Sequence, residues 1–91
     1  MANPNDPKPD KGPKPKEIDI EVNGKTVLMN EKDSTGLEIK QAAIAQQVNI
    51  QIGFVLTQEL PNGSSLIIGD NDSVRLHEHL RFTAIAPDDN S

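Results

Sequence analysis

The stretch EIDIEVNGKTVLMN, residues 17–30, contains the strongest short hairpin signal in the chain. Its first half alternates strictly between acidic and apolar residues, which is the pattern of a strand with one face on a core and the other in water. Asn23 and Gly24 follow, and both residue types tolerate the positive φ angles of a type I′ turn. The second half then returns as another strand. The stretch therefore predicts an antiparallel β-hairpin.

A change of period after the hairpin indicates a helix. Thr35 and Glu38 have the spacing of a capping box. The side chains that follow recur at intervals of three and four residues, so they share one helical face. The sequence predicts a helix over residues 36–47, too short to be stable without packing. Its core-facing stripe is expected to be Ile39, Ala42, Ala43 and Gln46.

The second half of the chain reads as strands separated by turns. The expected strands are 54–60, 65–68, 74–76 and 80–86. This order predicts an α+β fold, with one helix on one face of a mixed sheet. The last strand can lie parallel to the first, because the connection through the helix is long enough for parallel pairing. The helix is expected to stack on Ile18, Ile20, Val22, Val27 and Phe82.

Composition divides the chain at residue 16. Residues 1–16 hold five of the seven prolines and four lysines. Such a segment cannot bury enough surface to offset its ordering entropy, so it is predicted to be a disordered arm. Residues 17–87 remain for one domain, and residues 88–91 for a flexible tail.

Charge and composition argue against several function classes. Four lysines against two aspartates give the arm a charge of +2, which leaves −7 for residues 17–91 out of the total of −5. An acidic body without tryptophan or tyrosine is poorly suited to phosphates and bases, so no nucleic-acid partner is expected. No apolar run approaches the roughly 18 residues of a membrane span, and no signal peptide is evident. We expect a cytoplasmic monomer without membrane association.

Residues capable of chemistry are sparse. The chain has no cysteine, and its two histidines, His77 and His79, are weak evidence for a metal site without a third ligand. Residues 70–73 resemble the start of a calcium loop but lack the glycine and glutamate that an EF-hand requires, so a polar turn is expected. Gly-rich phosphate loops and nucleophile elbows are absent from the sequence. We expect no enzymatic activity, no metal and no cofactor.

Several short motifs follow one another along the chain in the order that is typical of one protein family. The Asn-Gly turn leads to a Thr-Gly-x-x-Ile helix start, and a late Asp-x-Val-x-Leu run and a phenylalanine follow. The matching positions are Asn23, Gly24, Thr35, Gly36, Ile39, Asp72, Val74, Leu76 and Phe82. Over about 70 of the 91 residues the chain resembles the bacterial ubiquitin-like family called multiubiquitin. The resemblance implies a ubiquitin-like β-grasp, a mixed four- to five-stranded sheet with one helix on one face.

The resemblance also implies the role of a protein modifier. Members of the family are similar to ubiquitin in role and are encoded beside E1-like, E2-like and peptidase proteins, in systems of which some are linked to defence against phage. The E1-like enzyme would activate the C-terminus, and the E2-like enzyme would carry it to a target. A final strand that runs into a loose tail suits this role. Processing or conjugation is expected at Asp88, Asp89, Asn90 and Ser91.

The tail departs from ubiquitin because it has no terminal Gly-Gly, whose backbone passes a narrow channel without a Cβ. Either a peptidase trims the tail, or the partners accept a non-glycine end, or the domain is not conjugated.

Two other functions stay open. A non-covalent ubiquitin-like interaction module would use an apolar patch on the open face of the sheet, and blocking its C-terminus would leave binding intact. A sulfur carrier shares the fold, although the missing Gly-Gly counts against it. The residues predicted for the patch are Leu28, Leu56, Ile67 and Ile85.

Overall fold

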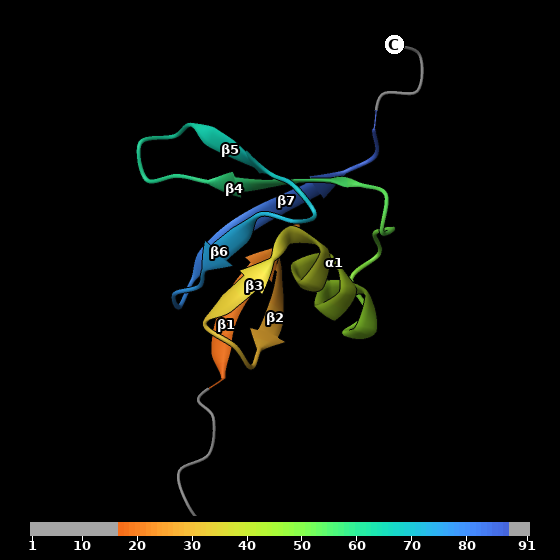
Figure 1. The fold of residues 1–91 in the computed structure, drawn as a ribbon, viewed down its shortest axis with the longest axis horizontal. Helices are drawn as coiled ribbons and strands as arrows, with labels where there is room; N and C mark the ends of the chain where they lie inside the picture. Colours follow the sequence, from red (N-terminus) through yellow and green to blue (C-terminus); the bar gives the residue numbers. More distant parts are fainter. Residues whose placement is uncertain (1–16, 88–91) are drawn as a thin grey trace, which may run out of the picture.

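The described part of the chain folds into a mixed sheet, one helix and a small second sheet (Figure 1). The computed structural model describes residues 17–87, so the predicted arm, 1–16, and tail, 88–91, lie outside it. In chain order the elements are β1 (Ile18–Val22), β2 (Lys25–Met29), β3 (Asp33–Thr35), α1 (Gly36–Ala45), β4 (Val55–Glu59), β5 (Ser65–Ile68), β6 (Ser73–Arg75) and β7 (Leu80–Ile85).

The first two strands form the predicted hairpin. Asn23 and Gly24 have φ angles of 54° and 81°, as a type I′ turn requires. The antiparallel register places Ile20 opposite Val27, and both side chains are buried. The apolar faces of β1 and β2 therefore coincide, and the hairpin prediction is confirmed.

The main sheet has five strands in the order β2-β1-β7-β4-β5. β7 lies between β1, to which it is parallel, and β4, to which it is antiparallel. The predicted parallel pairing of the first and last strands is confirmed. One helix on this mixed sheet gives a β-grasp-like α+β fold, as expected.

A second, two-stranded sheet was not predicted. β3 pairs antiparallel with β6, with Ser34 opposite Val74. Residues 33–35 are polar and show no alternation that would indicate a strand. Their extended conformation depends on a partner about 40 residues away in the chain, so local sequence could not reveal it.

The helix begins at the predicted capping box. The Thr35 hydroxyl accepts a hydrogen bond from the Glu38 N–H (3.2 Å), and the Glu38 carboxylate accepts one from the Thr35 N–H (2.8 Å). The helix ends at Ala45 rather than at residue 47, because Gln47 has a φ of 79°, outside the right-handed helical region.

The turn before β6 is fastened to the first turn of α1. The Gly36 N–H donates to the Asp72 carbonyl (3.1 Å), and the Leu37 N–H donates to the Asp70 carbonyl (3.2 Å). These bonds satisfy helix N–H groups that have no partner within the helix. A Cβ on Gly36 would overlap the Gly69 carbonyl oxygen, so only glycine fits this contact as it stands.

The core lies between α1 and the main sheet. Ile39 and Ala43 of the predicted helical stripe are fully buried, whereas Ala42 is partly buried and Gln46 is exposed. All five sheet residues predicted to lie beneath the helix are buried in one cluster, as expected: Ile18, Ile20, Val22, Val27 and Phe82.

Lys40 is a buried charge that the sequence did not reveal. Its side chain is only 4% exposed, and its Nζ donates to the Phe54 carbonyl (2.8 Å) and forms an ion pair with Asp70 (2.8 Å). A buried ammonium requires such partners. The pair therefore joins the middle of α1 to the same turn that holds its N-terminus.

Candidate protein-interaction surface

The predicted conjugation site begins where the last strand ends. β7 is paired on both sides, with β1 and with β4, where Ile85 lies opposite Val55. Ala86 and Pro87 follow and are exposed. The two paired neighbours fix the place from which the chain continues beyond the sheet (Figure 1). The predicted processing residues, Asp88, Asp89, Asn90 and Ser91, lie outside the described residues.

Asn23 fastens the last strand near its end. Its side chain accepts a hydrogen bond from the Ala84 N–H (2.8 Å) and donates one to the Ala84 carbonyl (3.0 Å). Its own N–H donates to the Phe82 carbonyl (3.0 Å). The amide group thus continues the β1–β7 pairing beyond the end of β1. Sequence reasoning assigned Asn23 to the turn alone and missed this second role.

Three of the four predicted patch residues are exposed, but Leu56 is not. Leu28, Ile67 and Ile85 are 40%, 68% and 56% exposed, whereas Leu56 is 1% exposed. Leu56 lies opposite Ala84 on one side and Ile68 on the other, and both neighbours are also buried. Because residues opposite one another point to the same face, Leu56 belongs to the core, and its assignment to the patch was wrong.

Val55 takes the place that was predicted for Leu56. It lies opposite Ile85, and on the same face Ile67 is opposite Thr57, two residues along β4 from Val55. We name Val55, Ile67 and Ile85 the open-face cluster. Alternation along β4 shows only that Val55 and Leu56 lie on opposite faces, and it does not show which of the two is buried.

Leu28 does not join this cluster. It lies on β2, at the opposite edge of the sheet, and its neighbour across the strand pair is Asp19. The open face of β1 between them is acidic, and Glu21 lies 3.5 Å from Arg81. The structure therefore brings together Ile67 and Ile85, through Val55, and separates Leu28 from them by charged residues.

The two histidines occupy an exposed connection rather than a strand. The segment that holds His77 and His79 joins β6 to β7, and both side chains are exposed. His79 has a φ of 70°, and its N–H donates to the Asp19 carbonyl (2.6 Å). The two histidines therefore lie in an exposed turn and not side by side on a strand.

The acidic turn of residues 69–72 is held by its own hydrogen bonds. The Asp72 carboxylate accepts a hydrogen bond from the Gly69 N–H (2.8 Å), and Asp70 forms its ion pair with Lys40. The expected polar turn is confirmed. Over residues 17–87, no three side chains of the metal-binding types are grouped closely enough to hold an ion. Within the same residues, no helix has the length and hydropathy needed to cross a membrane.

This surface is suited to binding proteins. An apolar cluster beside threonines and scattered charges combines a dry centre with a polar rim, which is the usual composition of a protein interface. The family model described as Multiubiquitin matches residues 18–88 of the chain. No curated protein and no solved structure matches it.

Proposed function

Because the chain belongs to the Multiubiquitin family and carries its ubiquitin-like domain, we propose that it is the modifier of a bacterial ubiquitin-like conjugation pathway. Ubiquitin-like domains are generally non-catalytic and act through protein partners. The proposed partners are an E1-like activating enzyme, an E2-like conjugating enzyme and a processing or deconjugating peptidase. Adenylation consumes ATP, so we assign the pathway to the cytoplasm. We extend the proposal to defence against phage on the strength of the family resemblance.

The observation that carries the proposal is the way the last strand ends. β7 is paired on both sides, and Asn23 holds Ala84 within three residues of the exposed Pro87. An enzyme that acts on the C-terminus therefore meets a folded domain that ends at one defined point, a few residues before the reactive carboxylate. Holding the domain in one orientation lowers the entropy cost of placing the terminus in an active site.

The chemistry requires an exposed carboxylate beyond Pro87. In the proposed sequence a peptidase cleaves within Asp88–Ser91, for instance before Ser91, which leaves Asn90 as the terminal residue. The new carboxylate attacks the α-phosphorus of ATP and releases pyrophosphate, and a partner thiol then displaces AMP to form a thioester. Transfer to a target amine breaks the thioester and forms an amide, so the domain itself supplies no catalytic group.

The test is intact mass spectrometry of the full chain. It is co-expressed with the E1-like, E2-like and peptidase proteins of an operon that encodes a multiubiquitin protein. The expected result is a shortened chain, together with a covalent adduct through the new C-terminus, formed only when the E1-like enzyme is active. A chain that ends at Pro87 is the control and should remain unconjugated. An unmodified chain ending at Ser91 beside active partners would contradict the proposal.

The open-face cluster favours a second candidate, a non-covalent interaction module. Ile67 and Ile85 are more than half exposed and lie on one face of the sheet. In this case, Ile85→Asp would weaken partner binding at least tenfold, because a charge would replace a buried apolar contact. A chain that ends at Pro87 would leave binding unchanged. These two variants distinguish the module from the modifier, which loses conjugation when the chain ends at Pro87.

A further inference from the structure

The two edges of the main sheet differ in whether their backbone groups are hydrogen-bonded. At the β2 edge, the Gln46 side chain accepts from the Leu28 N–H (2.9 Å) and donates to the Leu28 carbonyl (2.8 Å). This side chain occupies the pairing position that another strand would use. At the other edge, β5 is the outermost strand, and among residues 17–87 no strand pairs with its outer side (Figure 1). Exposed edges of this kind are available to pair with another chain.

The ladder determines which residues of β5 present free backbone groups. Phe82 and Ala84 of β7 bond toward Asn23, away from β4. Backbone groups in an antiparallel ladder alternate in direction. Thr57 and Val55 therefore bond to β7, and Leu56 and Gln58 bond to β5.

The residues of β5 alternate in the same way. Ile68 and Leu66 are the partners of Leu56 and Gln58, so their backbone groups point to β4. The N–H and C=O groups of Ser65 and Ile67 consequently point to the open edge.

The β5 edge lacks the features that usually prevent pairing. Residues 60–69 carry no charged side chain, although one residue in four of the chain is charged. The strand Ser65–Ile68 contains no proline, and Leu66 and Ile67 are 51% and 68% exposed. Natural edge strands are commonly protected by lysine, proline or a bulge. Within the part of the chain that the structure describes, the edge is therefore largely apolar, uncharged and unpaired along the length of the strand.

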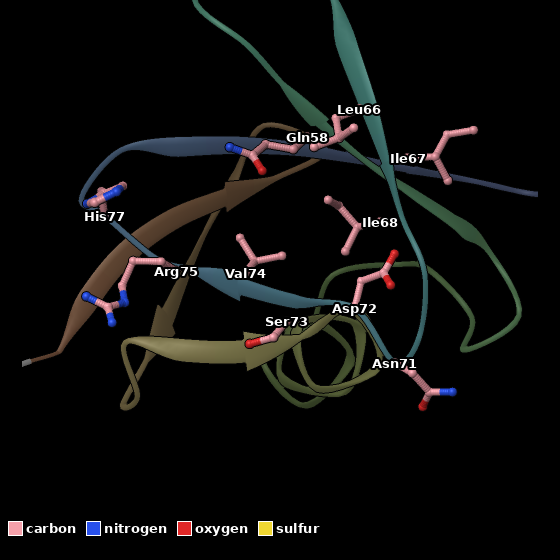
Figure 2. Close-up of a pocket in the computed structure, with 10 residues that line it drawn as sticks. All are labelled: Gln58, Leu66, Ile67, Ile68, Asn71, Asp72, Ser73, Val74, Arg75 and His77. Atoms are coloured by element: carbon pink, nitrogen blue, oxygen red, sulfur yellow. The ribbon is translucent and has the colours of Figure 1, made fainter.

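A groove runs beside this edge on the inner face of the sheet. It has a volume of about 590 Å³ and lies between β5 and β6. Figure 2 shows Ile68 and Val74 directed into the space between the two strands, and Ile67 directed to the opposite side. Leu66 lines the groove although half of its surface is exposed. An apolar side chain placed next to Leu66 from outside the edge would meet these walls.

We propose that β5 pairs with β5 of a second copy of this chain, antiparallel and centred on Leu66. The free backbone groups belong to Ser65 and Ile67, one residue on each side of Leu66. A two-fold axis through Leu66 therefore places Ser65 of one copy opposite Ile67 of the other, and forms about four hydrogen bonds. The two Leu66 side chains face one another as a non-hydrogen-bonded pair, the closer kind, next to the two grooves.

Charge selects a second copy over a charged peptide. Each chain carries −5 in total, but the strand and the turn before it carry none, so two copies meet without like charges at the seam. An acidic or basic peptide would find no counter-charge on Ser65–Ile68. A four-residue contact falls below the roughly 1,000 Å² of a stable interface. The dimer is therefore weak, with a Kd between about 10 μM and 1 mM, and the chain is a monomer when dilute.

The test is sedimentation of the full chain across about 10 μM to 2 mM, a range that brackets the expected Kd. The wild-type mass should rise from monomer toward dimer. Leu66→Lys and Leu66→Glu should each remain monomeric, because like charges would stand directly opposite. A one-to-one mixture of the two variants should recover the dimer. Ile52→Lys is the matched control, an exposed apolar residue in the turn before β4 and away from the edge, and should dimerise as the wild type does.

A covalent readout tests the register. The chain has no cysteine, so Leu66→Cys introduces a single thiol. Facing residues of a non-hydrogen-bonded pair lie within reach of a disulfide, so mild oxidation should give a covalent dimer. Asn62→Cys, in the β4–β5 turn, should form it at least tenfold more slowly. A wild-type chain that stays monomeric at 2 mM, a Leu66→Lys chain that dimerises normally, or a mixture that fails to dimerise would overturn the proposal.

Discussion

At the scale of single residues, Asn23 has two roles, one of its backbone and one of its side chain. Its positive φ closes the first hairpin, and its amide group binds both backbone atoms of Ala84. The turn could use glycine at this position equally well, because glycine adopts positive φ without strain. The hydrogen bonds to Ala84 could not survive that change. The residue therefore links the start of the fold to its last strand.

We expect Asn23→Gly to lower the free energy of unfolding by about 1–2 kcal/mol, which is the usual effect of losing two hydrogen bonds at a partly buried position. The backbone turn should persist. The effect specific to this bond is faster hydrogen exchange at the Ala84 amide. The relative exchange rates of the amides in α1 should not change. Urea unfolding and exchange by NMR measure the two effects. Unchanged exchange at Ala84 would show that the amide group does not hold the strand.

Gly36 shows how closely the turn approaches the helix. We expect Gly36→Ala to destabilise the domain by about 1–3 kcal/mol, because its Cβ would overlap the Gly69 carbonyl oxygen and force the backbone apart. Gly53→Ala is the control, since no atom lies within 4 Å of a Cβ there. Thermal unfolding of both variants provides the comparison. Equal stability of the two variants would mean that the 69–72 turn can move away from residue 36 without loss of stability.

At the scale of elements, α1 is held at three places. The capping box and the 69–72 turn hold its first turn, Lys40 holds its middle, and Gln46 binds the edge of β2 at its end. The isolated helix has only ten residues, which is marginal in water. Its stability therefore comes from these contacts and from the core.

The buried ion pair between Lys40 and Asp70 should contribute more to the free energy of unfolding than an exposed ion pair does. Asp70→Ala leaves the ammonium of Lys40, which is 4% exposed, with a carbonyl as its only protein partner in the described structure. We expect a loss of about 1.5–3 kcal/mol. Asp33→Ala breaks the ion pair with Arg75, in which both side chains are more than half exposed, and should cost about 0–1 kcal/mol. Chemical denaturation at matched ionic strength measures both, and equal losses would contradict the assignment.

Gln46 protects the β2 edge, and its removal tests that role. Gln46→Ala should raise hydrogen exchange at the Leu28 amide and cost about 0.5–1.5 kcal/mol, because two hydrogen bonds are replaced by bonds to water. Gln41→Ala is the control on the exposed face of α1 and should stay within about 0.5 kcal/mol of the wild type. Unchanged exchange at Leu28 would exclude the protective role.

At the scale of the whole molecule, the fold and the proposed reactive end are separable. The pairing of β7 ends at Ile85, so a chain that stops at Pro87 keeps every strand pair of the described domain. We expect its unfolding temperature to match that of the full chain within about 2 °C. The same truncation should abolish conjugation by the E1-like and E2-like partners. A truncated chain that unfolds at a much lower temperature would show that residues 88–91 contribute to the stability of the fold.

The local features of this protein could be predicted from its amino-acid sequence. The alternation in residues 17–22, the Asn23-Gly24 turn and the Thr35–Glu38 cap each depend on residues a few positions apart. Backbone preference and side-chain periodicity act at that range, so these elements and the β-grasp order could be predicted. The family motifs led to the ubiquitin-like assignment, which the Multiubiquitin match to residues 18–88 confirms.

The partners that those elements meet depend on how the whole chain packs. β4 has apolar residues on both faces, so its pattern could not show that Leu56 is buried and Val55 faces outward. The pairing of β3 with β6 and the burial of Lys40 join residues about 30 to 40 positions apart in the chain. Local preference does not encode such contacts. They form because packing the whole chain must satisfy every buried backbone group and charge at once.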